Sequence, residues 1–206
     1  MPSLVQRYKE QATVARVKKF YSVFSQAYTM AIQENGTIDG WGLKDTVISE
    51  DDDGNSIHSD VSLEQYDKFF EIISKYLTKA DYHKIHNSKQ GESENSGYVM
   101  ADGTQIVGIY LQPSRCNDDY TYCGDFYIKT DGKPYYDANK KFRPNIFVFK
   151  LEPYKISPIG TDDRTFKNFC LNGENYSRCT GWVILNGNMD YLHCRDLSIN
   201  GKTKCK

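Results

Sequence analysis

The six cysteines are the residues whose chemistry follows most directly from their spacing. All six fall in the second half of the 206-residue chain, mostly among Asn, Asp, Gly and Tyr. An even count, with neighbours separated by 7, 9 and 11 residues, favours three local disulfides. The pairs that we favour are Cys116 with Cys123, Cys170 with Cys179, and Cys194 with Cys205. Other pairings stay open, above all Cys179 with Cys194, because sequence alone cannot choose among them.

Zinc binding is the alternative use of these cysteines. No CxxC pair occurs, and His193 is adjacent to Cys194 without a paired ligand behind it. We therefore predict an oxidising compartment, where disulfides form and persist. If every cysteine is paired, no thiolate remains for a Cys-His hydrolase, and the GxSxG motif of serine hydrolases does not occur. We expect no catalytic residue and no enzymatic activity.

One acidic loop is similar to a calcium-binding template. Ser49, Asp51, Asp53, Gly54 and Asp60 occupy its first, third, fifth, sixth and twelfth places. Ser replaces the usual Asp at the first place, and Asp replaces the usual Glu at the last. Because two ligand positions are degraded, an exposed acidic turn without a ligand is the favoured interpretation. We keep these residues as calcium candidates and expect no cofactor otherwise.

Two further polar groups were considered as metal sites. His83 and His86 lie three residues apart, and Asp81 precedes them. No cysteine and no second carboxylate nearby completes a ligand set. Asp118, Asp119 and Asp125 form a second acidic loop near the first cysteine pair. We predict that both groups are solvated.

Composition limits the remaining classes of protein. A formal net charge of −1 provides no global field that would attract nucleic acid or anionic lipid, so we predict no nucleic-acid partner. Sixteen tyrosines and ten phenylalanines favour β-structure and buried surfaces over disorder. The length suits one sizeable domain.

The elements that position these residues begin with a long helix. Apolar residues recur at alternating steps of three and four from Val14 to Ala31, which is the pattern of an amphipathic helix. The helix can start near Pro2, and it is predicted to stop at Asn35 and Gly36.

The two halves of this helix differ in composition. Residues 6–19 carry many charges around few apolar positions, whereas residues 20–31 are rich in large apolar side chains. We expect the second half to dock on a core and the first half to project. Deletion of residues 1–16 is accordingly expected to leave the stability of the head nearly unchanged.

A second helix and several strands follow. Ser62 and Gln65 match a capping box, and apolar spacing predicts a helix from there to about Ala80. Strands are predicted at 98–100, 105–111, 126–129 and 146–151, with turns at 102–103 and 131–132.

These patterns predict an α+β fold. A long N-terminal helix packs on an antiparallel β-sheet, a second helix lies in the connection between them, and the C-terminal region is rich in disulfides. We expect a single domain, in which residues 1–35 form the helix and residues 36–206 the globular head. Export requires a targeting signal, but the chain opens on a polar helix without an apolar core. We therefore expect it to be a fragment whose leader and anchor lie upstream.

Several patches of the chain, in order, resemble the type IV pilin-like family, which includes the pseudopilins of type II secretion systems. The matching patches are residues 2–6 (PSLVQ), 12–19 (ATVARVKK), 100–104 (MADGT), 131–133 (DGK), 143–149 (RPNIFVF), 179–184 (CTGWVI) and 186–191 (NGNMDY). The diagnostic leader, which ends in Gly before a Phe-initiated apolar run, does not occur in this sequence.

This resemblance implies a pilin-like fold and a structural function. The chain would be the head of a pseudopilin or minor pilin, with other pilin subunits as partners. A preceding helix would anchor it in the bacterial inner membrane, and the head would face the periplasm or the outside. Lys18 and Lys19 would then lie on an assembly surface. The alternative is a secreted module that binds a glycan or a surface partner through exposed Tyr and Trp side chains.

Overall fold

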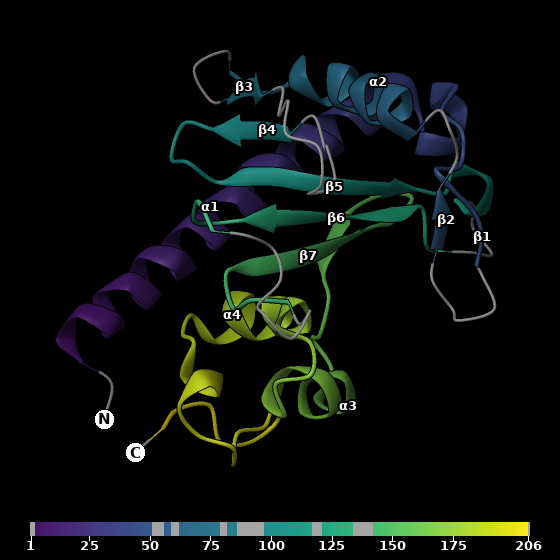
Figure 1. Ribbon diagram of the computed structural model, residues 1–206. Helices are drawn as coiled ribbons and strands as arrows, with labels where there is room; N and C mark the ends of the chain where they lie inside the picture. Colours follow the sequence, from purple (N-terminus) through teal and green to yellow (C-terminus); the bar gives the residue numbers. More distant parts are fainter. Residues whose placement is uncertain are drawn as a thin grey trace.

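The N-terminal apolar stripe folds as one helix that crosses an antiparallel sheet, and a helical C-terminal region lies beside both (Figure 1). The computed structural model describes residues 3–50, 56–58, 62–78, 82–85, 97–116, 121–133 and 142–205. The predicted α+β fold is confirmed, with its long helix, its second helix in the connection and its disulfide-rich C-terminal region.

The elements have the following bounds. The α-helices are α1 Leu4–Asn35, α2 Ser62–Ser74, α3 Asp163–Thr165 and α4 Thr180–Asn186. The strands are β1 Val47–Glu50, β2 Ser56–His58, β3 Tyr82–Ile85, β4 Gly97–Met100, β5 Gln105–Leu111, β6 Gly124–Lys129, β7 Ile146–Leu151 and β8 Ile156–Pro158. The shorter helices are η1 Ile38–Trp41, η2 Pro113–Arg115, η3 Phe166–Leu171, η4 Tyr176–Cys179 and η5 Asp190–Leu192.

Helix α1 has the boundaries that its sequence predicted. The Ser3 hydroxyl accepts a hydrogen bond from Gln6 N at 3.2 Å and so caps the first turn. Gly36 ends the helix at a φ of 76°, which favours a residue without a side chain. The 32 residues span about 48 Å at 1.5 Å per residue. Within the described part of the chain, no helix is long and apolar enough to cross a membrane.

Aromatic rings fill the contact between α1 and the sheet. Phe20 stacks on Phe24 with 5.1 Å between ring centroids, and Phe24 lies 5.0 Å from Phe126. Phe149, on the neighbouring strand, stacks on Phe126 at 5.5 Å. All four rings are buried. Each of them contributes about 1.5–3 kcal/mol through removal of its surface from water.

The expectation that the whole first half of α1 projects is wrong. Val14 and Val17 are buried, and Arg16 Nη1 donates a hydrogen bond to Thr130 O at 2.9 Å. Contact with the head begins at Glu10, because the C-terminal region folds back alongside this part of the helix. In this half of the helix, the stretch that is exposed at every position runs from residue 3 to residue 9.

The main sheet has six antiparallel strands in the order β3-β4-β5-β6-β7-β8, so chain neighbours are also spatial neighbours. The predicted turn at 102–103 joins β4 to β5, and the predicted strand at 146–151 is β7. Phe126 pairs with Phe149 across β6 and β7, which places both rings on the face that α1 covers. Strands β1 and β2 form a separate small sheet.

Helix α2 closes the core at the other end of α1. Phe70 on α2 lies 6.4 Å from Phe24 on α1, and the helix also contacts β5. The helix ends at Ser74, earlier than predicted, and its last turn leads to the buried Leu77. Gln65, which the sequence assigned to a capping box, accepts a hydrogen bond from Lys44 N at 2.8 Å.

The chain contains three disulfides, two of them in the C-terminal region, and their pairing is the one we favoured. The structure joins Cys116 to Cys123, Cys170 to Cys179, and Cys194 to Cys205. No cysteine in the protein is free. Helix α4 connects this region to the core, since it contacts α1, β7 and β8.

One close backbone approach fixes the position of α4. Gly181 N donates to Ile159 O at 2.7 Å, and a Cβ on Gly181 would meet the Gly160 carbonyl carbon at 2.4 Å. No real side chain tolerates that distance. A glycine at 181 is therefore required for the segment after β8 to pass under the start of α4.

Candidate functional site

A cleft of about 1040 Å³ lies between the first turns of α1 and the C-terminal segment. Its lining includes Gln6, Arg7 and Glu10 from the helix, and Asn188, His193 and Lys204 from the C-terminal segment. Residues near the two ends of the chain therefore share one surface (Figure 1). This cleft and the exposed helix tip beside it form the candidate functional site.

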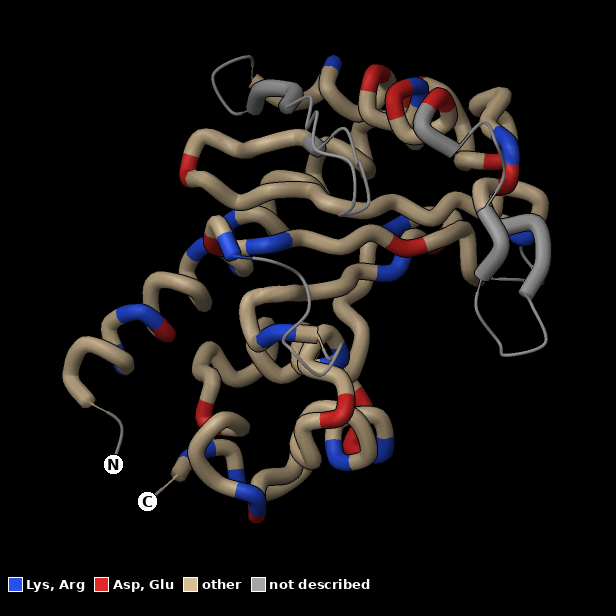
Figure 2. Tube along the Cα trace, viewed as in Figure 1, with Lys and Arg blue, Asp and Glu red and all other residues tan. Residues whose placement is uncertain are grey.

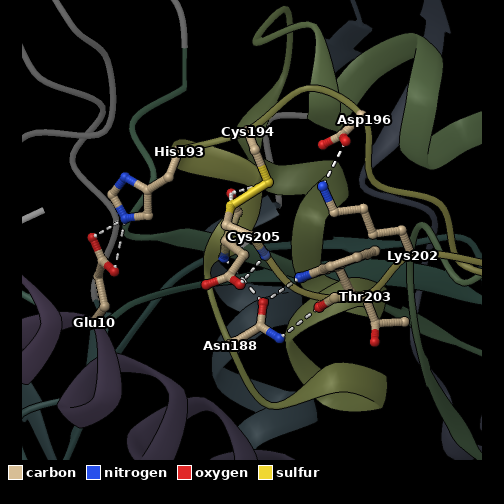
Figure 3. The surroundings of a disulfide bond; sticks show 10 residues. Glu10, Asn188, His193, Cys194, Asp196, Lys202, Thr203 and Cys205 are labelled. Carbon is tan, nitrogen blue, oxygen red and sulfur yellow. Dashed lines mark hydrogen bonds and ion pairs between the residues drawn. A yellow bond between two sulfur atoms is a disulfide. The ribbon is translucent and has the colours of Figure 1, made fainter. Parts of the chain in front are cut away.

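A hydrogen-bonded contact between Glu10 and His193 joins the two walls of the cleft (Figure 3). His193 Nε2 lies 2.9 Å from Glu10 Oε1 and 3.0 Å from Oε2. The side chains are 15% exposed for Glu10 and 17% for His193, so the pair is largely shielded from water. A shielded pair with two short contacts stabilises more than one on the open surface. It therefore couples the helix to the last segment of the chain.

The C-terminal wall is ordered by Asp190 and by the third disulfide. Asp190 Oδ2 accepts a hydrogen bond from Cys205 N at 2.7 Å, and its carbonyl oxygen accepts from Cys194 N at 3.1 Å. The Cys194–Cys205 disulfide closes the same loop. His193 precedes Cys194 directly, so the loop that the disulfide closes also places the imidazole. Sequence analysis paired the cysteines but not the histidine.

Asn188 connects this loop to the core. Its Oδ1 accepts from the buried Trp182 Nε1 at 2.8 Å, and its Nδ2 donates to Thr203 O at 3.1 Å. The Asn188 side chain therefore links the end of the loop at Thr203 (Figure 3) to the buried indole of Trp182.

Below the cleft lies the fully buried side chain of Tyr191. Its hydroxyl has no hydrogen-bond partner within the described part of the protein. Burial raises the pKa of this phenol, and the nearby negative charge of Glu10 raises it further. The hydroxyl therefore stays protonated, and an unpaired buried hydroxyl of this kind costs about 1–3 kcal/mol.

The cations of the cleft differ in their pairing. Lys202 Nζ pairs with Asp196 Oδ2 at 2.5 Å. Arg7 and Lys204 are exposed, and neither has an ion-pair partner among the residues that the structure describes. The same holds for Lys9, two residues further along α1. Basic and acidic residues thus both lie around this end of the molecule (Figure 2).

The helix tip, defined here as residues 4–9, also exposes large apolar surface. Leu4 is 85% exposed, Val5 63% and Tyr8 72%. Because adjacent apolar side chains on a surface mark contacts with other molecules, the tip is a candidate interaction surface.

The two predicted assembly lysines are both exposed on α1. Lys18 lies against α4, where a Cβ on Gly187 would meet its Nζ at 3.0 Å. A cation is favourable at that helix end because the last carbonyl groups of α4 point toward it. Lys19 lies beside Phe20, Val23 and Asp102 in a small hollow. Their role in assembly stays a prediction.

The structure describes only a few of the residues that the sequence suggested as metal ligands. Ser49 lies in β1, whereas Asp51, Asp53, Gly54 and Asp60 lie outside the described residues. His83 lies in β3, and His86, Asp118 and Asp119 also lie outside them. In the described ranges, no three His, Cys, Asp or Glu side chains are grouped so that they could hold a metal ion.

Asp125 corrects the prediction that its loop is solvated. The residue lies in β6, and its Oδ2 accepts a hydrogen bond from the Tyr122 hydroxyl at 2.9 Å. Its Oδ1 is buried and has no hydrogen-bond partner among the described groups. Burial raises the pKa of Asp125 to about 6, although the Tyr122 hydrogen bond and the charge of Arg178 oppose the rise. Asp125 is half-buried at a strand position, which its acidic neighbours in the sequence did not indicate.

Comparison with known proteins identifies a family rather than an activity. The searches of curated proteins and of solved structures each found no match. One family model matches residues 3–178, a range that contains Glu10 and ends before His193. The match covers most of the chain, and the protein therefore belongs to the family of unknown function DUF6613.

Proposed function

We propose that this chain is the head of a pilin-like assembly subunit, a pseudopilin or minor pilin of a bacterial type II secretion or type IV pilus-like machine. The observation that carries the proposal is the form of α1. One continuous helix contacts the head from Glu10 onward and packs on an antiparallel sheet through its second half, and its first two turns extend from the head fully exposed. The resemblance of the sequence patches to that family points the same way.

The exposed tip has a physical reason to be part of a larger assembly. An isolated helical end gains little from its own hydrogen bonds, because helix formation depends on packing for most of its stability. Leu4, Val5 and Tyr8 find no packing on the head. Contact with neighbouring subunits would cover these side chains and stabilise the tip. The proposed role is therefore structural, without catalysis.

The proposed location follows from the disulfides. Three disulfides favour an oxidising compartment, which agrees with a periplasmic or extracellular head. In this proposal, a helix encoded upstream anchors the head in the inner membrane. Other subunits of the same machine are the partners.

The alternative of a secreted binding module receives no support from the two tryptophans. Trp182 is fully buried and stacks on Phe166, and Trp41 is half-buried between Tyr28 and Phe69. The tryptophans expected on a glycan-binding surface are thus part of the core. Tyr8 and Tyr154 do remain exposed. Their exposure allows a direct test.

The test is photo-crosslinking from these two tyrosines in cells that express the protein from its complete gene. A photoreactive phenylalanine analogue replaces Tyr8, which is 72% exposed on the tip, or Tyr154, which is 63% exposed on the head and serves as the control. We expect adducts with another subunit of the same machine from position 8 and none from position 154. Adducts only with an unrelated protein would favour the binding module, and the absence of adducts at position 8 would contradict the subunit function.

A further inference from the structure

We infer that the Cys194–Cys205 disulfide is a site of thiol–disulfide exchange, at which a dithiol reductant releases the end of the chain from the wall of the cleft while the rest of the fold persists. The released segment is residues 203–205, which we call the C-terminal strap. Neither the reactivity of this disulfide nor the release of the strap depends on the proposed subunit function.

The three disulfides differ in their access to solvent. Cys194 and Cys205 are both half-buried. The cysteines of the other two disulfides are at most 1% exposed: Cys116, Cys123, Cys170 and Cys179. Exchange requires a thiolate to reach a disulfide sulfur, so access limits its rate. A reductant can therefore react with the Cys194–Cys205 disulfide without opening the core.

The Cys194–Cys205 disulfide also borders a space that a reductant can enter. Both cysteines line the cleft of about 1040 Å³ between α1 and the C-terminal segment. Cavities of about 300–1,000 Å³ accept organic molecules larger than a small dithiol. Cys116 borders a smaller hollow beside η2, but it is 1% exposed and its partner Cys123 is fully buried. The cleft therefore favours the third disulfide over the first.

The exchange proceeds in two steps. A thiolate of the reductant attacks one sulfur of the disulfide, the S–S bond breaks, and the other cysteine leaves as a thiolate that takes up a proton from water. The second thiol of the reductant then loses its proton and displaces the first cysteine from the mixed disulfide. Two electrons pass from the dithiol to the protein, so Cys194 and Cys205 become thiols and the reductant becomes a disulfide.

The middle of the loop that this disulfide closes is attached to the head by other contacts. Leu197 is 1% exposed. Asp163 Oδ1 accepts hydrogen bonds from Ser198 Oγ at 2.9 Å and from Ile199 N at 2.8 Å. These contacts do not involve either cysteine, so we expect them to persist after reduction. The structural change that follows reduction is therefore local.

The strap itself is attached by the disulfide and by hydrogen bonds at its two ends (Figure 3). Thr203 O accepts from Asn188 Nδ2 at 3.1 Å, and Cys205 N donates to Asp190 Oδ2 at 2.7 Å. Chain ends held by so few hydrogen bonds fray, because the entropy of the free chain opposes ordering. Lys204 and Cys205 line the cleft, so fraying of the strap opens that wall.

The size of the effect follows from the length of the closed loop. The two cysteines are separated by 11 residues in the sequence. In the chain-entropy model, opening a closure of this length favours the released state by about 100-fold. We therefore expect amide hydrogens of the strap to exchange up to about 100-fold faster after reduction. Those of the buried strand β7 should exchange at an unchanged rate.

The first experiment is reduction of the folded 206-residue chain with dithiothreitol, followed by alkylation at intervals and peptide mass mapping. We expect Cys194 and Cys205 to be alkylated about 100-fold faster than the other four cysteines, which react only when the core opens. Circular dichroism should show a retained fold while only this disulfide is reduced. Reduction of all three disulfides at one rate, or of Cys116–Cys123 first, would overturn the inference.

The second experiment is hydrogen–deuterium exchange of residues 200–205 and of β7 in the double variant Cys194→Ser with Cys205→Ser. Faster exchange confined to residues 200–205 is the expected result. The matched control is Cys116→Ser with Cys123→Ser, which removes a disulfide elsewhere and should leave exchange of the strap unchanged. If this control does not fold, the oxidised and the partly reduced wild-type chains supply the same comparison.

Two results of the exchange measurement would contradict the release of the strap. Unchanged exchange at residues 200–205 in the Cys194→Ser, Cys205→Ser variant would show that the hydrogen bonds alone hold the strap. Equal acceleration in β7 would show that this disulfide stabilises the whole fold, so that its reduction could not act locally.

Discussion

Two N-terminal truncations distinguish the part of α1 that stabilises the head from the part that does not. Removal of residues 1–8 deletes six described positions, 3–8, all of them exposed, and we expect the free energy of unfolding to change by less than about 1 kcal/mol, mainly through loss of the Ser3 cap. Removal of residues 1–16 also deletes Glu10, Val14 and Arg16, which contact the head. We expect a large loss of stability, contrary to what the helix sequence alone suggests.

The magnitude follows from three contacts. The Glu10–His193 pair and the hydrogen bond from Arg16 to Thr130 O each involve an ionisable side chain and are worth about 1.5–3 kcal/mol. Burial of Val14 contributes about 1.5–3 kcal/mol. The lower ends of these ranges sum to roughly 4–5 kcal/mol. A domain of this size is stable by about 5–15 kcal/mol, so the longer truncation should leave a marginal fold.

The assay is urea denaturation followed by tryptophan fluorescence, because Trp182 is buried and reports loss of the core. Glu10→Gln, Val14→Ala and Arg16→Gln in the complete chain divide the loss among its sources. The reasoning is refuted if the longer truncation costs less than about 1 kcal/mol, or if both truncations cost the same. In either case the contacts between α1 and the C-terminal region would contribute nothing to folding.

Three further predictions concern single groups. Because burial raises the pKa of Asp125 from 3.8 to about 6, its ionised form destabilises the fold; stability should rise by about 2–3 kcal/mol as pH falls from about 7 to 4. Asp125→Asn should be more stable than the wild type near pH 7 and lack this dependence in denaturant titrations at several pH values; an unchanged pH profile would show that the carboxyl is not buried in solution. Gly181→Ala should lower the melting temperature strongly, since a Cβ there would meet the Gly160 carbonyl at 2.4 Å, whereas Gly40→Ala has open space and should change it little. Thiol titration of the unreduced, denatured protein should find no free cysteine, and two or more free thiols would contradict both the disulfides and the proposed compartment.

Local signals account for the elements that sequence predicted correctly. The stripe from Val14 to Ala31 has the period of a helix, and a glycine with positive φ follows it directly. The run in β7 is rich in β-branched and aromatic residues, and a tight turn joins β4 to β5. The favoured disulfide pairs could be predicted for a similar reason, because each closes a short loop between neighbouring cysteines.

Local sequence patterns could not predict the C-terminal helices, nor where along α1 the exposed part ends and contact with the head begins. Helix α4 has seven residues and η5 three, which is too short for a hydrophobic period to show. The charged half of α1 looked solvated because its apolar positions are few. Its contacts come from a segment at the far end of the chain, and no local pattern records them.

Sequence by itself therefore determined the α+β class, the length of α1 and the hairpin of β4 and β5, and it favoured, without fixing it, the pairing of the cysteines that the structure shows. Only the tertiary structure brought Glu10 to His193 across 183 positions and placed Asp125 half-buried in a strand. The physical reason is the range of the forces involved. Helical periods, turns and short disulfide loops depend on residues close in sequence, whereas burial and charge compensation depend on whichever distant segments the fold brings together.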